Sequence, residues 1–193
     1  MDIKIPYTPR KHQKLLHQQI DKHRWSVLVC HRRFGKTVCM INHLIKSALM
    51  SKQKNPRFAY LAPTFKQAKS IAWDYMKQFT DKIPHTKFNE TELRVDLPNG
   101  ARITLLGSDS PDGLRGIYLD GCVIDEYANV NSRLFPEIIR PALSDRKGYC
   151  VFIGTPAGMN NNFYELYQHA NGADDWFNYK AKASDTKIVD EEE

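Results

Sequence analysis

Two short groups of residues have the types and spacing for phosphate chemistry. In the first, Gly35, Lys36 and Thr37 follow an apolar run at 27–29 and precede an apolar helical pattern. This is the strand–loop–helix order of a phosphate-binding loop. In such a loop, backbone N–H groups surround phosphate oxygens, the lysine reaches the β- and γ-phosphates, and the threonine hydroxyl binds Mg²⁺. The match is incomplete, because Cys30 stands where the pattern has its first glycine.

The second group is the pair Asp125 and Glu126, which ends a short apolar run at 119–124. Carboxylates at the C-terminal end of a parallel strand lie at the edge of the sheet where ligands bind. We expect Asp125 to hold Mg²⁺ and Glu126 to orient and deprotonate an attacking water. Without a phosphate loop upstream, the pair would indicate only a solvated turn.

Further polar residues stand where the same site needs them. Thr155 ends another apolar run, so its hydroxyl would lie beside the phosphate loop and could sense a γ-phosphate. Near the N-terminus, Tyr7 and Gln13, with Arg10 nearby, could hold an adenine by stacking and hydrogen bonding. The alternative for this segment is a surface helix that packs on the edge of the sheet.

The elements that position these residues alternate between strand and helix patterns. Residues 7–24 predict a turn and a helix, with Thr8 as its cap and Pro9 in its first turn. Thr64 and Gln67 form a capping box before an amphipathic helix. The alternation predicts an α/β fold, a three-layer α/β/α sandwich around a mostly parallel sheet of the RecA-like (ASCE) P-loop class. The remaining predicted elements are buried strands at 57–63, 148–154 and 176–183, an antiparallel β-hairpin at 93–105, and helical segments at 132–146, bounded by Pro136 and Pro141, and 160–170.

Composition is ordinary for a soluble protein of one domain, with 193 residues and 41% hydrophobic residues. The net charge is +6, and residues 1–36 alone carry +7, from nine basic and two acidic residues. A basic balance favours a polyanionic partner, although it could equally be a solvated face. We expect no membrane span, no signal peptide, and four reduced cysteines, as in a cytosolic protein.

Taken in order, these motifs resemble the ATPase motor of the large terminase subunit, the DNA-packaging enzyme of tailed bacteriophages and prophages. The resemblance runs from about residue 7 to residue 183 and rests on Tyr7 and Gln13, 32–37, 113–116, 123–126 and 154–156. It implies that Arg32, Arg33 and Phe34 belong to the phosphate-binding loop with Gly35, Lys36 and Thr37. It also implies that Arg115 is an arginine finger that completes the site of a neighbouring subunit. Arg32 is the competing candidate, and 154–156 resembles a motif that couples hydrolysis to DNA movement.

The resemblance further implies ATP and Mg²⁺ as cofactors and double-stranded DNA as a partner, gripped through its backbone by the basic surface. Other implied partners are the portal protein, the small terminase subunit and further copies in a ring, presumed pentameric, in the host cytoplasm. A free domain would be a monomer. We expect an ATPase domain at 1–183, an acidic tail or the start of a linker at 184–193, and no nuclease domain in this chain. The alternatives are a helicase-like ATPase and a portal-docking module with little turnover.

Overall fold

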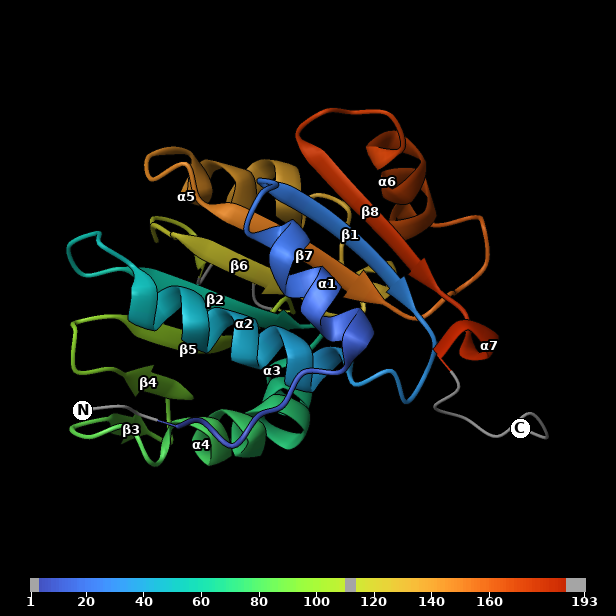
Figure 1. Cartoon of the computed structure of the whole chain (residues 1–193). Coiled ribbons are helices and arrows are strands. Elements are labelled where there is room, and N and C mark those ends of the chain that lie inside the picture. The colour runs from blue at the N-terminus through green and yellow to red at the C-terminus, as the bar shows by residue number, and fades with distance from the viewer. Residues whose placement is uncertain (1–3, 110–113, 187–193) are drawn as a thin grey trace.

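The strand that precedes the predicted phosphate loop is an inner strand of the sheet, with a parallel neighbour on each side. β1 (Trp25–Cys30) is buried along its whole length, as a continuous apolar run in a parallel sheet should be. It pairs in parallel with β7 (Tyr149–Gly154) on one side and with β8 (Trp176–Ala181) on the other. The computed structural model describes residues 4–109 and 114–186, and Figure 1 shows the arrangement.

Eight strands form one sheet in the order β3-β4-β5-β2-β6-β7-β1-β8. The six strands from β5 to β8 in this order run parallel, whereas β4 is antiparallel to both β3 and β5. The carboxyl ends of the parallel strands therefore share one edge, which we call the carboxyl edge. The remaining strands are β2 (Arg57–Ala62), β3 (Lys87–Asn89), β4 (Arg94–Asp96), β5 (Arg102–Gly107) and β6 (Gly121–Ile124).

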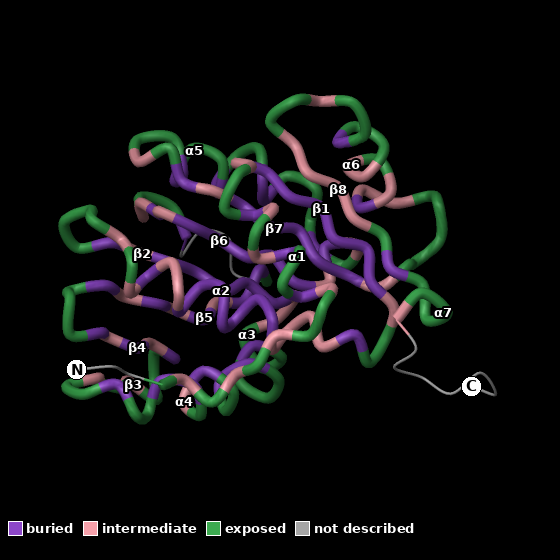
Figure 2. The backbone as a smooth tube through the Cα atoms, in the orientation of Figure 1, coloured by how far each residue is buried: buried purple, intermediate pink, exposed green. Residues whose placement is uncertain are grey.

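Helices cover both faces of this sheet and give two separate hydrophobic cores. One face carries α1 (Lys11–Ile20), α2 (Lys36–Met50) and a helical segment made of α3 (Phe65–Gln67), a π-helical stretch (Ala68–Trp73) and α4 (Asp74–Thr80). The other face carries a 3₁₀ turn (Tyr127–Asn129), a π-helical stretch (Phe135–Ile139), α5 (Arg140–Ser144) and α6 (Asn162–Ala170). Figure 2 shows the buried strands between these layers. The α/β sandwich predicted from the alternation is confirmed.

The hairpin prediction is also confirmed. Leu93, Val95 and Leu97 are buried on one arm, and Ala101, Ile103 and Leu105 are buried on the other. The capping box at the start of α3 is present, since Thr64 Oγ1 accepts the Gln67 N–H at 3.1 Å.

Several predicted boundaries are wrong. α1 begins at Lys11 rather than at Pro9, because Arg10 is still extended and the Gln13 side chain caps its N–H. Pro136 and Pro141 lie inside the helical segment, each in a first turn that needs no N–H donor, rather than at its ends. Strand β3 and the short helix α7 (Ala183–Thr186) were not predicted.

All four cysteines are buried and free, as expected for reduced thiols. Among the described residues, no helix is long and apolar enough to cross a membrane.

Candidate nucleotide-binding site

The predicted phosphate-binding loop lies between β1 and α2, at the carboxyl edge of the sheet. Gly35 has φ +84° at the N-terminus of α2, a left-handed conformation that favours glycine, and a Cβ there would lie 3.0 Å from Gln13 Nε2. The Lys36 ammonium donates to the carbonyl oxygens of Cys30 at 3.2 Å and His31 at 3.4 Å, so it lies over the loop. Cys30 is the last residue of the strand and pairs with Ala181, so its extended backbone does not need a glycine.

Helix α1 holds the loop from one side. Gln13, which is 4% exposed, donates to the Gly35 carbonyl at 3.3 Å, and Arg10 donates to the Phe34 carbonyl at 3.4 Å. Arg10, Gln13 and Phe34 line one pocket of about 190 Å³ with Lys11, His12 and Thr186. The structure thus brings two of the three predicted adenine-binding residues against the phosphate loop.

Tyr7, the third, is not placed with them. Its hydroxyl lies 3.0 Å from His17 Nε2, and its ring packs edge-on against Phe79. It lines a separate hollow between the N-terminal segment, α1 and α2. The surface-helix alternative therefore fits Tyr7 better than an adenine contact does.

The acidic pair follows β6, two strands away from β1. Asp125 is 6% exposed, and burial raises the pKa of its carboxyl group. The Tyr60 hydroxyl donates to Asp125 Oδ2, which opposes this rise. Burial also raises the pKa of the Tyr60 hydroxyl, whereas the nearby Thr37 side chain lowers it. Because both side chains act on one buried hydroxyl, Thr37 and Asp125 lie near the same point.

Those two oxygen groups fit Mg²⁺, which is commonly held by one or two carboxylates, water and phosphate oxygens rather than by a full protein cage. Within 4–109 and 114–186 there is no group of three His, Cys, Asp or Glu residues that could hold a metal. A metal site here would therefore have few protein ligands, an arrangement that Mg²⁺ tolerates.

Glu126 has an unusual backbone conformation, and its side chain is held by a residue that follows a neighbouring strand. Its backbone is left-handed, with φ +45° and ψ +49°, an unusual conformation for a residue other than glycine. Its Oε2 accepts hydrogen bonds from Thr155, at 3.1 Å from the hydroxyl and 3.4 Å from the backbone N–H. β7 lies between β6 and β1, which puts Thr155 between the acidic pair and the phosphate loop. The structure thus gives Thr155 a direct contact with Glu126.

The three arginines singled out in the sequence lie at the surface. Arg32, Arg33 and Arg115 are all exposed, and Arg33 is left-handed with φ +65°. Arg32 and Arg33 belong to the phosphate loop, whereas Arg115 follows the buried Leu114 in the segment before β6. Gly113, the first residue of its predicted motif, lies outside the described residues.

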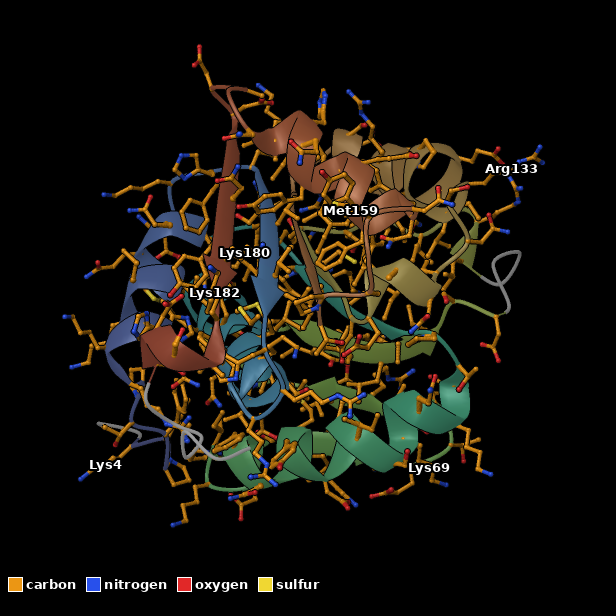
Figure 3. The ribbon with its side chains drawn as sticks, turned by 90° about the vertical axis from the view of Figure 1, so that its right-hand side faces the viewer. Lys4, Lys69, Arg133, Met159, Lys180 and Lys182 are labelled. Carbon is orange, nitrogen blue, oxygen red and sulfur yellow. The ribbon has the colours of Figure 1, made fainter. Side chains whose placement is uncertain are left out.

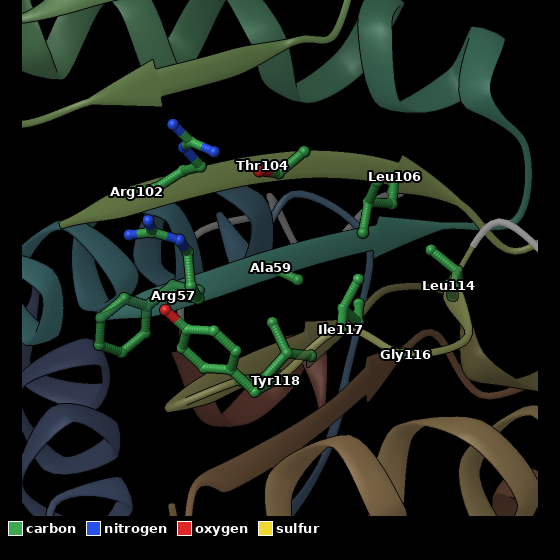
Figure 4. Close-up of a pocket in the computed structure, with 11 residues that line it drawn as sticks. Arg57, Ala59, Arg102, Thr104, Leu106, Leu114, Gly116, Ile117 and Tyr118 are labelled. Atoms are coloured by element: carbon green, nitrogen blue, oxygen red, sulfur yellow. The ribbon is translucent and has the colours of Figure 1, made fainter. Parts of the chain in front are cut away.

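A second pocket, of about 280 Å³, lies away from this site. Figure 4 shows it on the open face of β2 and β5, with Arg57 and Arg102 at one end and Leu114 and Ile117 along its wall. Both arginines already have partners, because Arg57 donates to the Gly100 carbonyl and Arg102 to Asp96. No residue of the phosphate loop lines this pocket, so it is not part of the nucleotide site.

Sequence reasoning missed Tyr60. It lies inside an apolar strand and looks like a core residue, and only the parallel neighbours of β2 reveal that its hydroxyl reaches Asp125. The one available indication was a hydroxyl within an otherwise apolar run.

An open, mostly parallel sheet with a phosphate loop after β1, an acidic pair after β6 and one strand between them defines an α/β protein of the RecA-like class. The chain belongs to the family described as "Terminase large subunit, T4likevirus-type, N-terminal", whose model matches residues 29–191.

Similar proteins agree with this assignment. The chain is 30% identical over 126 residues to the terminase large subunit of Thermus phage G20c, a match that covers 55% of this chain and 26% of that protein. The chain thus spans about a quarter of the curated relative. The large terminase ATPase domain of Thermus phage P74-26 has a TM-score of 0.78 at 22% identity, over 95% of this chain and 84% of that one. The large terminase of a thermophilic bacteriophage in complex with ADP has a TM-score of 0.79 at 16% identity, over 96% and 48%.

Proposed function

We propose that this chain is an ATP-hydrolysing motor domain that drives double-stranded viral DNA into a procapsid. The observation that carries the proposal is the continuous set of contacts at the carboxyl edge. Thr155 donates to Glu126, Glu126 follows Asp125, and Asp125 accepts from the Tyr60 hydroxyl, which lies near Thr37, the residue next to Lys36. Family membership and the ADP-bound relative support ATP as the nucleotide.

The residues divide the chemistry of hydrolysis among them. Lys36, Arg33 and the backbone at Gly35 bind the phosphates and neutralise charge that develops on the γ-phosphoryl group. Thr37 and Asp125 would hold Mg²⁺, which would supply further charge neutralisation.

The oxygen of the attacking water bonds to the γ-phosphorus while the bond between the γ-phosphorus and the β-phosphate oxygen breaks. Glu126 accepts the proton that this water loses. Thr155 fixes the carboxylate that receives this proton. The products are ADP and inorganic phosphate. Catalysis consists mainly of positioning and electrostatic stabilisation, as in other phosphoryl transfers.

The wider assembly is part of the same proposal. Arg115 would act in the site of a neighbouring copy, within a pentameric ring docked on a portal protein and served by a small terminase subunit in the host cytoplasm. We also propose that residues 1–183 form the motor domain and that residues 184–193 are an acidic tail or the start of a linker.

The test is nucleotide binding and hydrolysis by this chain, compared with its Glu126→Gln variant. We expect both proteins to bind ATP with Mg²⁺ with similar affinity, because Glu126 does not contact the phosphates in this proposal. We expect hydrolysis to fall by about 10² to 10⁴ in the variant, the usual contribution of general base catalysis. ATP binding without hydrolysis in the wild-type chain would instead favour the portal-docking module.

A further inference from the structure

The edge of the sheet opposite the nucleotide site carries an unusual density of positive charge. Three loops that precede parallel strands meet there, at 21–24 before β1, 52–55 before β2 and 145–148 before β7. Together these twelve residues hold six basic and two acidic side chains, which is +4 of the net +6 of the whole chain. We call this surface the basic edge. Figure 3 looks onto the other, carboxyl edge, so the basic edge faces away from the viewer.

Contacts between the loops make the basic edge continuous. Arg146 donates to the Lys54 carbonyl at 3.3 Å, which joins the loop at 145–148 to the loop at 52–55. A polar hollow of about 310 Å³ has Lys22, Arg24 and Lys147 in its wall, which joins the loop at 21–24 to the loop at 145–148. Arg24 is fixed in place, since it donates to the Gly148 carbonyl at 3.1 Å and lies over the Trp25 ring.

The lysines of this surface are available to a partner. Lys22, Lys52, Lys54 and Lys147 are exposed, and among the described residues none of their ammonium groups has a hydrogen-bond or ion-pair partner.

The nearby acids are mostly engaged elsewhere. Asp21 pairs with Lys46, and Asp120 accepts the Arg57 N–H at 2.7 Å and faces Arg146 at 3.7 Å. Asp145 is the remaining acid in the three loops.

We propose that the basic edge binds the phosphate backbone of double-stranded DNA, an inference that rests on the proposed function as a DNA motor. Unpaired lysines on several loops suit a repeating row of phosphates, which attracts cations without regard to base sequence. Two of these loops precede β1 and β7, the strands that carry the phosphate loop and Thr155 at their other ends. A movement of β1 or β7 relative to its neighbours would therefore reach both surfaces.

The test measures DNA affinity by fluorescence anisotropy of a short labelled duplex, over a range of salt concentrations. The test variant carries Lys22→Gln, Lys54→Gln and Lys147→Gln. The control variant carries Lys66→Gln, Lys82→Gln and Lys87→Gln, which removes the same charge from exposed lysines around α3, α4 and β3. ATP hydrolysis and thermal midpoints of all three proteins show that the site and the fold are intact.

We expect affinity at low salt to fall by at least about tenfold in the test variant. The slope of log affinity against log salt should become shallower by about 2 to 3, because each phosphate contact contributes about 0.9. The control should stay within about twofold of the wild type, since charges far from the contact are screened.

Two results would overturn the assignment while leaving the motor proposal standing. An equal loss in both variants would mean that net charge alone matters, and a loss only in the control would place DNA near β3. Wild-type affinity that does not change with salt would contradict backbone binding altogether, and with it the DNA part of the proposed function.

Discussion

Glu126 depends on two local features that are visible at the scale of single residues. Its backbone is left-handed directly after β6, and Thr155, which follows β7, holds Oε2 by a hydrogen bond. A carboxylate that must take a proton from water loses efficiency when its position fluctuates, because the reacting atoms must be held in line. We therefore propose Thr155 as a positioning residue for the Glu126 carboxylate.

Replacing Thr155 by Val should lower kcat by about tenfold to a hundredfold, since part of the contribution of the general base is lost. KM for ATP should change little, because Lys36 and the phosphate loop are untouched. Thr155→Ser keeps the hydroxyl and should restore most of the rate. Steady-state kinetics of the three proteins checks this, and an increase in KM with unchanged kcat would show that Thr155 serves binding instead.

Tyr60 supplies a second prediction at the same scale. Its hydrogen bond lowers the pKa of Asp125, against burial, which raises it. In Tyr60→Phe the pKa of Asp125 should therefore rise, so that more of the carboxyl is protonated at a given pH and fewer sites can hold Mg²⁺. The acid limb of hydrolysis should move to higher pH, and excess Mg²⁺ should reverse the loss. Mg²⁺ titrations at several pH values measure this, and unchanged titrations would separate Tyr60 from the metal site.

At the scale of elements, hydrophobic periodicity predicted much of the fold. The alternation at 93–105 and the runs before the phosphate loop and before Asp125 each gave the correct element, since the apolar face of each is buried. The order of strands was not accessible from periodicity, because it depends on which strands meet after long connections. β3 was missed because its three residues bury little. At the site, the positions of Lys36 and Asp125 followed from local pattern, whereas the contacts of Tyr60 and Thr155 required the sheet.

The contact between α1 and α2 contains a pair of histidines, buried His43 and half-buried His17, that should respond to pH. His17 Nδ1 lies 2.9 Å from His43 Nδ1, so one ring must donate and the other must accept, and both cannot be protonated there. Burial lowers the pKa of both rings, and it lowers that of His17 to about 4. The charge of Lys46 lowers both pKa values further, whereas the charge of Asp21 opposes the shift. Tyr7 and Cys39 are the other titratable groups that touch His17.

The pKa of His17 in the folded protein lies below its value of about 6.5 in the unfolded chain. At pH values between the two, the unfolded chain therefore binds more protons than the folded protein does. This contribution to stability is present above about pH 6.5 and is lost as pH falls towards about 4. His17→Gln should therefore show a smaller drop in urea midpoint between neutral and mildly acidic pH than the wild type does. The exposed His85→Gln serves as the control and should behave like the wild type. An identical drop in His17→Gln would show that the pair does not control acid stability.

At the scale of the whole molecule, the predicted nucleotide site and the cluster of basic residues lie at opposite edges of the sheet. The carboxyl edge carries the phosphate loop, the acidic pair and Thr155, while the opposite edge carries +4 on twelve residues. Arg115 is the arginine that the resemblance assigns to the site of a neighbouring copy. It is exposed in the segment before β6, whereas Asp125 at the end of the same strand is buried. We propose that this exposed arginine acts on a second copy.

If Arg115 completes a neighbouring site, specific activity should rise with protein concentration, and Arg115→Ala should lose about 10³ to 10⁵ in rate. Mixing two inactive variants separates the alternatives. Arg115→Ala keeps a complete acidic pair, and Glu126→Gln keeps the arginine, so an equimolar mixture should regain activity only if the arginine acts between copies. A mixture that stays inactive would place Arg115 in its own site. Full activity of Arg115→Ala alone, independent of concentration, would exclude it as the finger and leave Arg32, on the phosphate loop itself, to neutralise the transferred phosphoryl group.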